Sequence, residues 1–162
     1  MKRRPGKLFS TTPGTVPVFA IPRIIGPTTS DQTLIGTAYV NVAGLGVSIS
    51  PGTYFFHFYV VCDTDATTTG IDLAVNGPAN DYIYYTQFGF GSATASLARV
   101  MTTFDQNTAN ISCAGTTRQI YEVYGMIKAT AAGTLVPRIK REAVGTGPNV
   151  RAGCVGFLTP TA

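Results

Sequence analysis

The residues that could carry acid–base or nucleophilic chemistry are few and scattered along this sequence. It contains one histidine, His57, inside the apolar run YFFHFYV, and it has no Gly-x-Ser-x-Gly elbow. A hydrolase needs a nucleophile, a base and an orienting acid within reach of one another. Glu122 stands one position from an apolar strand face and Glu142 lies in a basic cluster, so they do not suggest paired carboxylates. We therefore expect no enzyme, and we interpret His57 as a buried imidazole that is hydrogen-bonded across an interface.

A metal site is only weakly indicated. Asp63-Thr64-Asp65 opens a Thr-rich loop and places two carboxylates at alternate positions, as calcium loops do. The loop has no bidentate acid further on, so a turn with Asx hydrogen bonds is the preferred interpretation and calcium is the alternative. Cys62, Cys113 and Cys154 share no metal-ligand spacing and lie in apolar surroundings, which predicts buried thiols. We expect no metal and no cofactor.

Two further clusters could contact a ligand or a neighbour. The first is aromatic, has a composition found in sugar-binding sites, and comprises Tyr82, Tyr84, Tyr85, Phe88 and Phe90 near Asp81 and Gln87. Packing of these rings inside the fold is the interpretation that the pattern favours. The second is basic and comprises Arg138, Lys140 and Arg141. It indicates either an edge strand blunted by charge or a contact with an acidic lattice neighbour. Nucleic acid is less favoured, because no clear aromatic stacking platform accompanies the cluster.

The chain has few charged residues, and they are unevenly distributed along the sequence. Charged residues make up 12% of the 162 residues, against about 25% in an average domain. Residues 1–30 carry five basic side chains and no acidic one, whereas residues 31–117 carry six aspartates and one arginine. The net charge of +4 therefore belongs to the ends of the chain, which argues against a basic globule that coats nucleic acid. A poorly charged surface suits a chain that is covered by copies of itself or by a partner.

Residues 1–30 form a segment of their own, and we predict an extended N-terminal arm. Five prolines interrupt it and prevent helix continuation. They also break the apolar run that a signal peptide needs, and no run reaches the roughly 18 apolar residues of a membrane-spanning helix. The arm is too apolar for a solvated tail, so we expect it to lie on a partner surface. The docking residues would be Lys2, Arg3, Arg4, Lys7, Val16, Val18, Phe19, Ile21, Arg23, Ile24 and Ile25.

From about residue 34 onward the sequence reads as β-strands. The run PGTYFFHFYVVC is apolar on both faces, because Phe55, His57, Tyr59 and Val61 alternate with another apolar set. A sandwich covers only the inner face of each sheet, so the second face needs a partner, most economically another copy of the chain. Strand-sized segments recur every 8–12 residues or so, which is typical of a sandwich or jelly roll.

The order of four segments resembles a known family of folds. PGTYFFHFYV, IDLAVNG, YEVYGMIKATAAGTL and AGCVGFLTP together resemble the trimeric jelly roll of tumour-necrosis-factor and complement globular-head proteins. The resemblance implies an all-β jelly-roll β-sandwich over residues 31–162 and a homotrimer. It adds Tyr121, Val123 and Phe157 to Phe55, His57, Tyr59 and Val61 as trimer-interface residues.

Phages use similar jelly rolls as capsid decoration (cement) proteins and as fibre tips. The arm fits a capsid-bound member, so the resemblance and the arm together imply a phage capsid decoration (cement) protein that trimerises and binds the capsid surface through its arm to stabilise the shell. Its partners would be itself and the major capsid protein, with no membrane and no nucleic acid. It would be assembled in the host cytoplasm and reside at the capsid surface. The alternatives are a receptor- or carbohydrate-binding tip of a tail fibre or spike, and a capsid shell protein whose arm faces nucleic acid.

Overall fold

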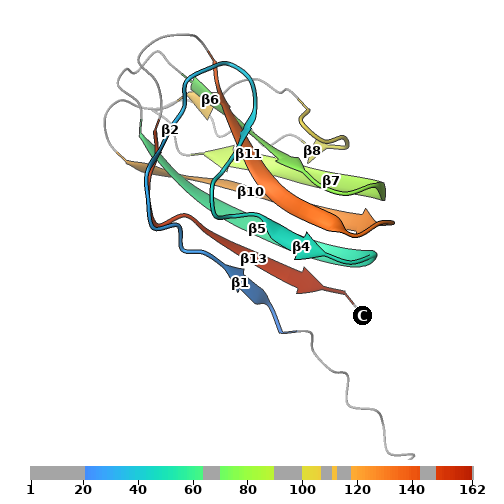
Figure 1. Cartoon of the computed structure of the whole chain (residues 1–162). Helices are drawn as coiled ribbons and strands as arrows, with labels where there is room; N and C mark the ends of the chain where they lie inside the picture. Colours follow the sequence, from blue (N-terminus) through green and yellow to red (C-terminus); the bar gives the residue numbers. More distant parts are fainter. Residues whose placement is uncertain are drawn as a thin grey trace, which may run out of the picture.

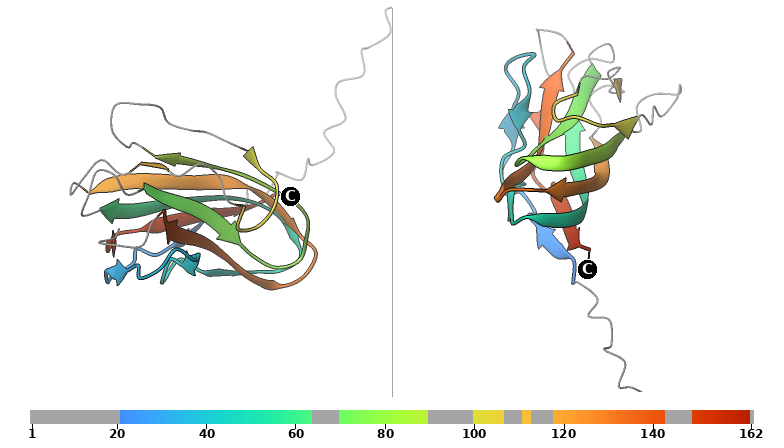
Figure 2. Two further views of the ribbon diagram at one scale, coloured as in Figure 1. Left: turned by 90° about the horizontal axis from the view of Figure 1, so that it is seen from above. Right: turned by 90° about the vertical axis from the view of Figure 1, so that its right-hand side faces the viewer.

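A computed structural model describes residues 21–63, 70–89, 100–106, 111–112, 118–142 and 149–161. Throughout these ranges the chain is all β, and two antiparallel sheets pack face to face as a sandwich (Figure 1). Figure 2 shows the two layers from two further directions. No helix in the described ranges is long and apolar enough to cross a membrane. The predicted all-β sandwich is confirmed, and the trimer stays a prediction.

Among the residues that the structure describes, the larger sheet has eight strands and the smaller sheet has five. The larger sheet runs in the order β1 (Arg23–Ile25), β13 (Val155–Pro160), β5 (Gly52–Asp63), β10 (Gln119–Ala129), β7 (Asn80–Gly89) and β8 (Val100–Met101), with β12 (Asn149–Val150) beside β5 and β2 (Gln32–Thr33) beside β12. The smaller sheet runs β3 (Val40–Asn41), β11 (Gly133–Arg141), β6 (Gly70–Asn76) and β9 (Ile111–Ser112), with β4 (Val47–Ile49) also beside β11.

The chain crosses repeatedly between the two sheets. β5 and β7 belong to the larger sheet while β6, between them in sequence, belongs to the smaller one. β10 and β11 are likewise consecutive strands in different sheets. Each sheet therefore places early strands beside late ones, as Greek-key connections do and a meander does not. The first strand and the last strand, β1 and β13, are neighbours (Figure 1).

Strand β10 is the centre of the larger sheet and fixes which side chains point outward. It pairs with β5 through eleven consecutive residues, so that Val123 stands opposite Phe58 and Tyr124 opposite His57. Because side chains alternate along a strand, Phe58 and Val123 point inward while His57 and Tyr124 point outward. Gly125 permits the close approach of β7, since a Cβ there would lie 2.1 Å from the main-chain oxygen of Tyr84.

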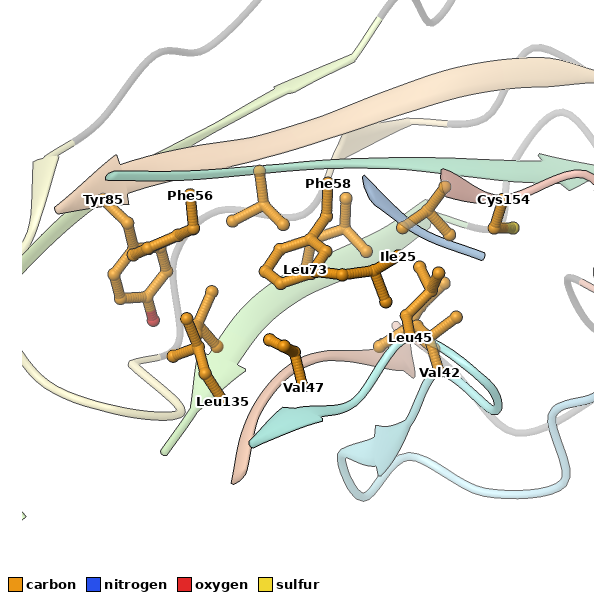
Figure 3. Close-up of a cluster of buried hydrophobic side chains, with 14 of the residues drawn as sticks. Ile25, Val42, Leu45, Val47, Phe56, Phe58, Leu73, Tyr85, Leu135 and Cys154 are labelled. Atoms are coloured by element: carbon orange, nitrogen blue, oxygen red, sulfur yellow. The ribbon is translucent and has the colours of Figure 1, made fainter. Parts of the chain in front are cut away.

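The core fills the space between the sheets. Phe56, Phe58 and Tyr85 reach inward from the larger sheet toward Leu73 and Leu135 of the smaller sheet (Figure 3). Each of these five side chains is 3% exposed or less. Fully burying a side chain of this size contributes about 1.5–3 kcal/mol, so these five together outweigh any single surface contact.

The sandwich begins earlier than residue 31, the boundary that the prolines predicted. Residues 23–25 form β1, and Ile25 is buried against the core. Thr28 continues the attachment, because its main-chain N–H donates to the oxygen of Cys154 at 2.9 Å. Of the predicted arm, residues 23–30 therefore belong to the sandwich or lie against it. Lys2, Arg3, Arg4, Lys7, Val16, Val18 and Phe19 lie outside the described residues.

Candidate assembly surface

The outer face of the larger sheet carries an unusual number of rings. We call it the aromatic face, and it comprises Phe55, His57, Tyr59, Tyr82, Tyr84, Phe88, Tyr124 and Phe157, with Ile24 and Ile120 at its margins. The side chains come from β1, β13, β5, β10 and β7, which lie side by side (Figure 1). Phe55 is 53% exposed and Tyr84 47% exposed, so large apolar groups of this isolated chain meet water. Exposed apolar patches of this extent mark interaction sites.

Several rings of this face contact a neighbouring ring. His57 stacks on Tyr59 with ring centres 4.2 Å apart, and Tyr59 meets Phe157 edge-on at 6.1 Å. Tyr82 and Tyr84 form a second stacked pair at 5.5 Å. Neighbouring aromatic side chains hold one another in place, so the face offers a largely preformed surface.

A shallow hollow of about 440 Å³ lies in the middle of the aromatic face. Phe55, His57, Tyr84, Tyr124 and Phe157 line it, together with Met126 and Thr159. The hollow is open to solvent along its length, so it suits a protruding side chain of a partner better than an enclosed small molecule.

A polar pair within the aromatic face joins β5 to β10. Nε2 of His57 lies 2.8 Å from Oε2 of Glu122, and the two side chains are 32% and 24% exposed. His57 therefore has a hydrogen-bond partner within the chain, and its predicted bond across an interface stays a prediction. The imidazole is half-buried in the isolated chain.

The structure places the predicted trimer-interface residues on two different sides. Phe55, His57, Tyr59, Val61 and Phe157 lie on the outer face, and their role in a trimer stays a prediction. Tyr121 and Val123 are corrected: both are 0% exposed within the core. Both occupy alternate β10 positions that point inward, so another copy cannot touch their side chains.

The predicted basic contact patch is also corrected. Strand β11 is flanked by β6 on one side and by β3 and β4 on the other, so it is not an edge strand. Its basic side chains are engaged within the chain instead. Arg138 pairs with Asp105, Lys140 pairs with Asp72 at 3.5 Å, and Arg141, only 7% exposed, donates to the main-chain oxygen of Leu34. None of the three is available to an acidic lattice neighbour.

These ion pairs close the outer face of the smaller sheet. We call Tyr39, Asp72, Asp105, Arg138 and Lys140 the polar clamp. The hydroxyl of Tyr39 donates to Oδ2 of Asp72 at 2.6 Å, and the Lys140 ammonium lies 4.7 Å from the centre of the Tyr39 ring. Asp72 is 0% exposed, and burial beside this carboxylate raises the pKa of Tyr39 well above its ordinary value. The clamp thus satisfies a buried carboxylate and leaves this face without an aromatic surface.

The residues of the predicted Asp63 loop and the cysteines make structural contacts wherever the structure describes them. Asp63 accepts a hydrogen bond from Nε of Arg151 at 2.6 Å, and Arg151 also pairs with Asp31. Asp65 lies outside the described residues, and within the described part no three acidic, His or Cys side chains gather as a metal cluster. Cys62 and Cys154 are buried thiols as predicted, and Cys113 lies outside the described residues. Burial raises the pKa of the Cys154 thiol, which keeps it protonated.

The aromatic cluster of β7 divides between core and surface. Tyr85 packs in the core, as the favoured interpretation predicted, and Gln87 accepts a hydrogen bond from the main chain of Leu73 at 2.9 Å. Tyr82, Tyr84 and Phe88 point outward, and Phe90 lies outside the described residues. Sequence reasoning placed Glu122 off the apolar face of this strand but assigned neither Glu122 nor Tyr124 to a contact surface. Their alternation with Tyr121 and Val123 was the signal that could have assigned both to the outer face.

No protein-family model and no curated protein matches the sequence. Among solved structures, the chain is similar to one chain of the structure of infectious bursal disease virus Gx strain, with 12% identity and a TM-score of 0.26. The similarity covers 88% of this chain and 40% of that chain. At this TM-score the likeness carries no argument about function.

Proposed function

We propose that this chain is a non-enzymatic structural protein of a phage virion, a decoration protein that trimerises through its aromatic face and attaches to the capsid through its N-terminal arm. One observation carries the proposal: the side of the sandwich opposite the polar clamp exposes a contiguous layer of aromatic side chains. A monomer gains nothing by leaving such a surface in water, whereas an assembly buries it.

A second copy is the partner that this face fits best. Each charged group of the face has a partner within the chain, since Glu122 lies against His57 and Lys128 pairs with Asp81 at 2.6 Å. Copies of the face can therefore converge without leaving a charged side chain unpartnered. The six strands β1, β13, β5, β10, β7 and β8 contain 3, 6, 12, 11, 10 and 2 residues. At about 3.3 Å per residue and about 4.8 Å between strands, they span about 700 Å² per copy. This lies within the roughly 600–1,000 Å² per partner of standard stable interfaces.

The attachment to a capsid is supported by the arm. Four basic residues stand within the first seven positions, and apolar residues follow between prolines. Basic groups would attract an acidic shell surface, and the apolar groups would supply contact area. Three arms on one trimer would multiply weak contacts through their effective concentration. The trimeric state follows the resemblance of the sequence to trimeric jelly rolls.

The test compares the full chain with a variant that lacks residues 2–20, which precede the sandwich. Light scattering should give a trimer for both chains, and occupancy on purified capsids should fall at least tenfold for the shortened chain. A length-matched variant with Lys2, Arg3, Arg4 and Lys7 changed to Gln separates charge from contact area. Undiminished occupancy of the shortened chain would exclude the arm as the attachment, and a monomeric full chain would exclude the assembly.

A carbohydrate-binding fibre tip is the second candidate, because Tyr82 and Tyr84 form an exposed stacked pair beside Asp81 and Lys128. Sugar rings stack on such platforms. Glycan-array binding by the full chain that is lost in Tyr84→Ala would favour this candidate. The absence of any glycan signal from a trimeric protein would leave decoration as the better account.

A further inference from the structure

The His57–Glu122 pair is the polar centre of an otherwise apolar contact surface. The imidazole stacks on Tyr59 at 4.2 Å and meets the ring of Tyr124 at 5.2 Å, while Nε2 faces the carboxylate of Glu122 at 2.8 Å. The hollow of the aromatic face is lined by His57, and a second open hollow of about 450 Å³ touches both His57 and Glu122. Any partner that covers the rings therefore also covers this pair.

Glu122 is the charged group that the described neighbours bring to His57. On β5 the outward neighbours are Phe55 and Tyr59, and on β13 the residue opposite is Phe157. On β10 the outward neighbours are Glu122 and Tyr124, the latter opposite His57 itself. Lys128 lies four residues further along β10, opposite Thr53, where it pairs with Asp81. The net charge of the site is thus decided by two side chains.

The charge state of the His57–Glu122 pair becomes important for binding when a partner excludes water from the pair. Whenever the imidazole is neutral and the carboxylate ionised, the pair carries one negative charge, and water can stabilise that charge only while the pair is uncovered. Covering it by aromatic groups removes that solvation, and an unbalanced buried charge is costly. One proton from solvent converts the pair to imidazolium and carboxylate, with no net charge and a charge-assisted hydrogen bond.

We propose that self-association through the aromatic face takes up one proton at each His57–Glu122 pair that it covers. This inference rests on the proposed function. The partner is a second copy, and it binds more tightly as pH falls from 7.5 to 6. Histidine side chains change charge between pH 5 and 8, and this chain has only one histidine. Comparison of the native chain with variants of His57 and Glu122 therefore assigns a proton taken up in that range to this pair.

The size of the effect follows from linkage. Uptake of one proton changes an association constant by up to tenfold per pH unit. A trimer that covers three pairs would change its overall association constant by up to about a thousandfold per pH unit. The range below pH 7.5 avoids the titration of cysteine thiols and limits that of the N-terminal amine.

The experiment measures the association constant of the full chain by analytical ultracentrifugation at pH 6.0, 6.75 and 7.5, at constant ionic strength. We expect at least a tenfold tightening from pH 7.5 to 6.0. Glu122→Gln should remove this dependence, because the pair is then uncharged without an added proton. Glu142→Gln is the matched control, since it changes the chain's other glutamate, which lies beyond the aromatic face at the end of β11 and accepts from Gly70 N–H.

His57→Gln tests the same inference from the other side. It leaves Glu122 charged, so association should be weak and unchanged between pH 6.0 and 7.5. An oligomer whose association constant does not vary with pH would overturn the inference and leave the proposed function standing. A pH dependence that persists in Glu122→Gln would overturn it as well. A chain that is monomeric throughout would overturn both.

Discussion

The outer face of the smaller sheet is closed by the chain's own polar clamp, whereas the outer face of the larger sheet leaves its rings in contact with water. On the closed side, Asp72 is 0% exposed and its charge is met by Tyr39 and Lys140. On the open side, Phe55 and Tyr84 are each about half exposed. The chain therefore covers one outer face with its own side chains, and the open face is the one that we propose a second copy covers.

Breaking the closed side should have the largest effect on folding. Asp72→Ala removes the acceptor of Tyr39 and the counter-charge of Lys140, and removing one partner of a buried pair costs about 3–5 kcal/mol. Urea denaturation should show this loss in the free energy of unfolding. Self-association of the folded fraction should be unchanged, because the clamp lies on the opposite sheet. A loss below 1 kcal/mol would mean that the clamp is not the stabilising cover described here.

Breaking the open side should affect assembly and leave folding intact. Phe55→Glu places a charge in the aromatic face, and central aromatic contacts are worth about 2–4 kcal/mol in stable interfaces. The association constant measured by light scattering should fall at least thirtyfold, with the urea midpoint unchanged. Ile35→Glu is the control, since Ile35 is 85% exposed and lies outside the aromatic face. Equal assembly of both variants would contradict the role of this face.

The third prediction concerns the pH dependence of stability that the core residue Tyr85 produces. Burial raises the pKa of Tyr85 to about 12, and its hydroxyl donates to the oxygen of Thr103 at 3.2 Å. The folded chain thus favours the neutral phenol, so this contribution is complete below pH 10 and is lost as pH rises through about 12. The urea midpoint of the native chain should fall between pH 10 and 12. Tyr85→Phe should lessen that fall, and an identical fall in both chains would contradict the assignment.

The smallest effect belongs to the ion pair at the margin of the open face. Lys128 and Asp81 are 49% and 48% exposed, and exposed pairs contribute little to stability. Lys128→Ala should leave the urea midpoint within experimental error. A clear loss of stability would show that this exposed pair stabilises the fold as the pairs of the polar clamp do.

Alternation along single strands predicted more of this molecule than clusters of residue type did. The two apolar faces of β5 could be seen in PGTYFFHFYVVC, and they led directly to Phe55, His57 and Tyr59 as an outer face. The same rule set Glu122 one position from the apolar face of β10. The family resemblance nevertheless assigned Tyr121 and Val123 to the trimer interface, because a motif reports which strand a residue is on and not which way it points.

The prediction of a basic contact patch on β11 was wrong for a different physical reason. Arg138, Lys140 and Arg141 looked like a surface patch because charged side chains are seldom buried. Their acceptors come from Tyr39, Asp72, Asp105 and the main chain of Leu34, which lie 33 to 107 positions away in sequence. Only the folded topology brings these groups together. Local sequence patterns therefore could not predict the polar clamp, and they could not predict the ion pairs of Arg151 with Asp31 and Asp63.

The pairing of β1 with β13 has a mechanical consequence. Any pull on residues 1–20 reaches the sandwich first at Arg23, at the end of a ladder of three residue pairs. Behind that ladder stand the buried side chain of Ile25 and the hydrogen bonds between Thr28 and Cys154. A sustained load would therefore peel this short strand before it strained the long β5–β10 pairing. The first strand would act as a tether that yields while the rest of the domain keeps its shape.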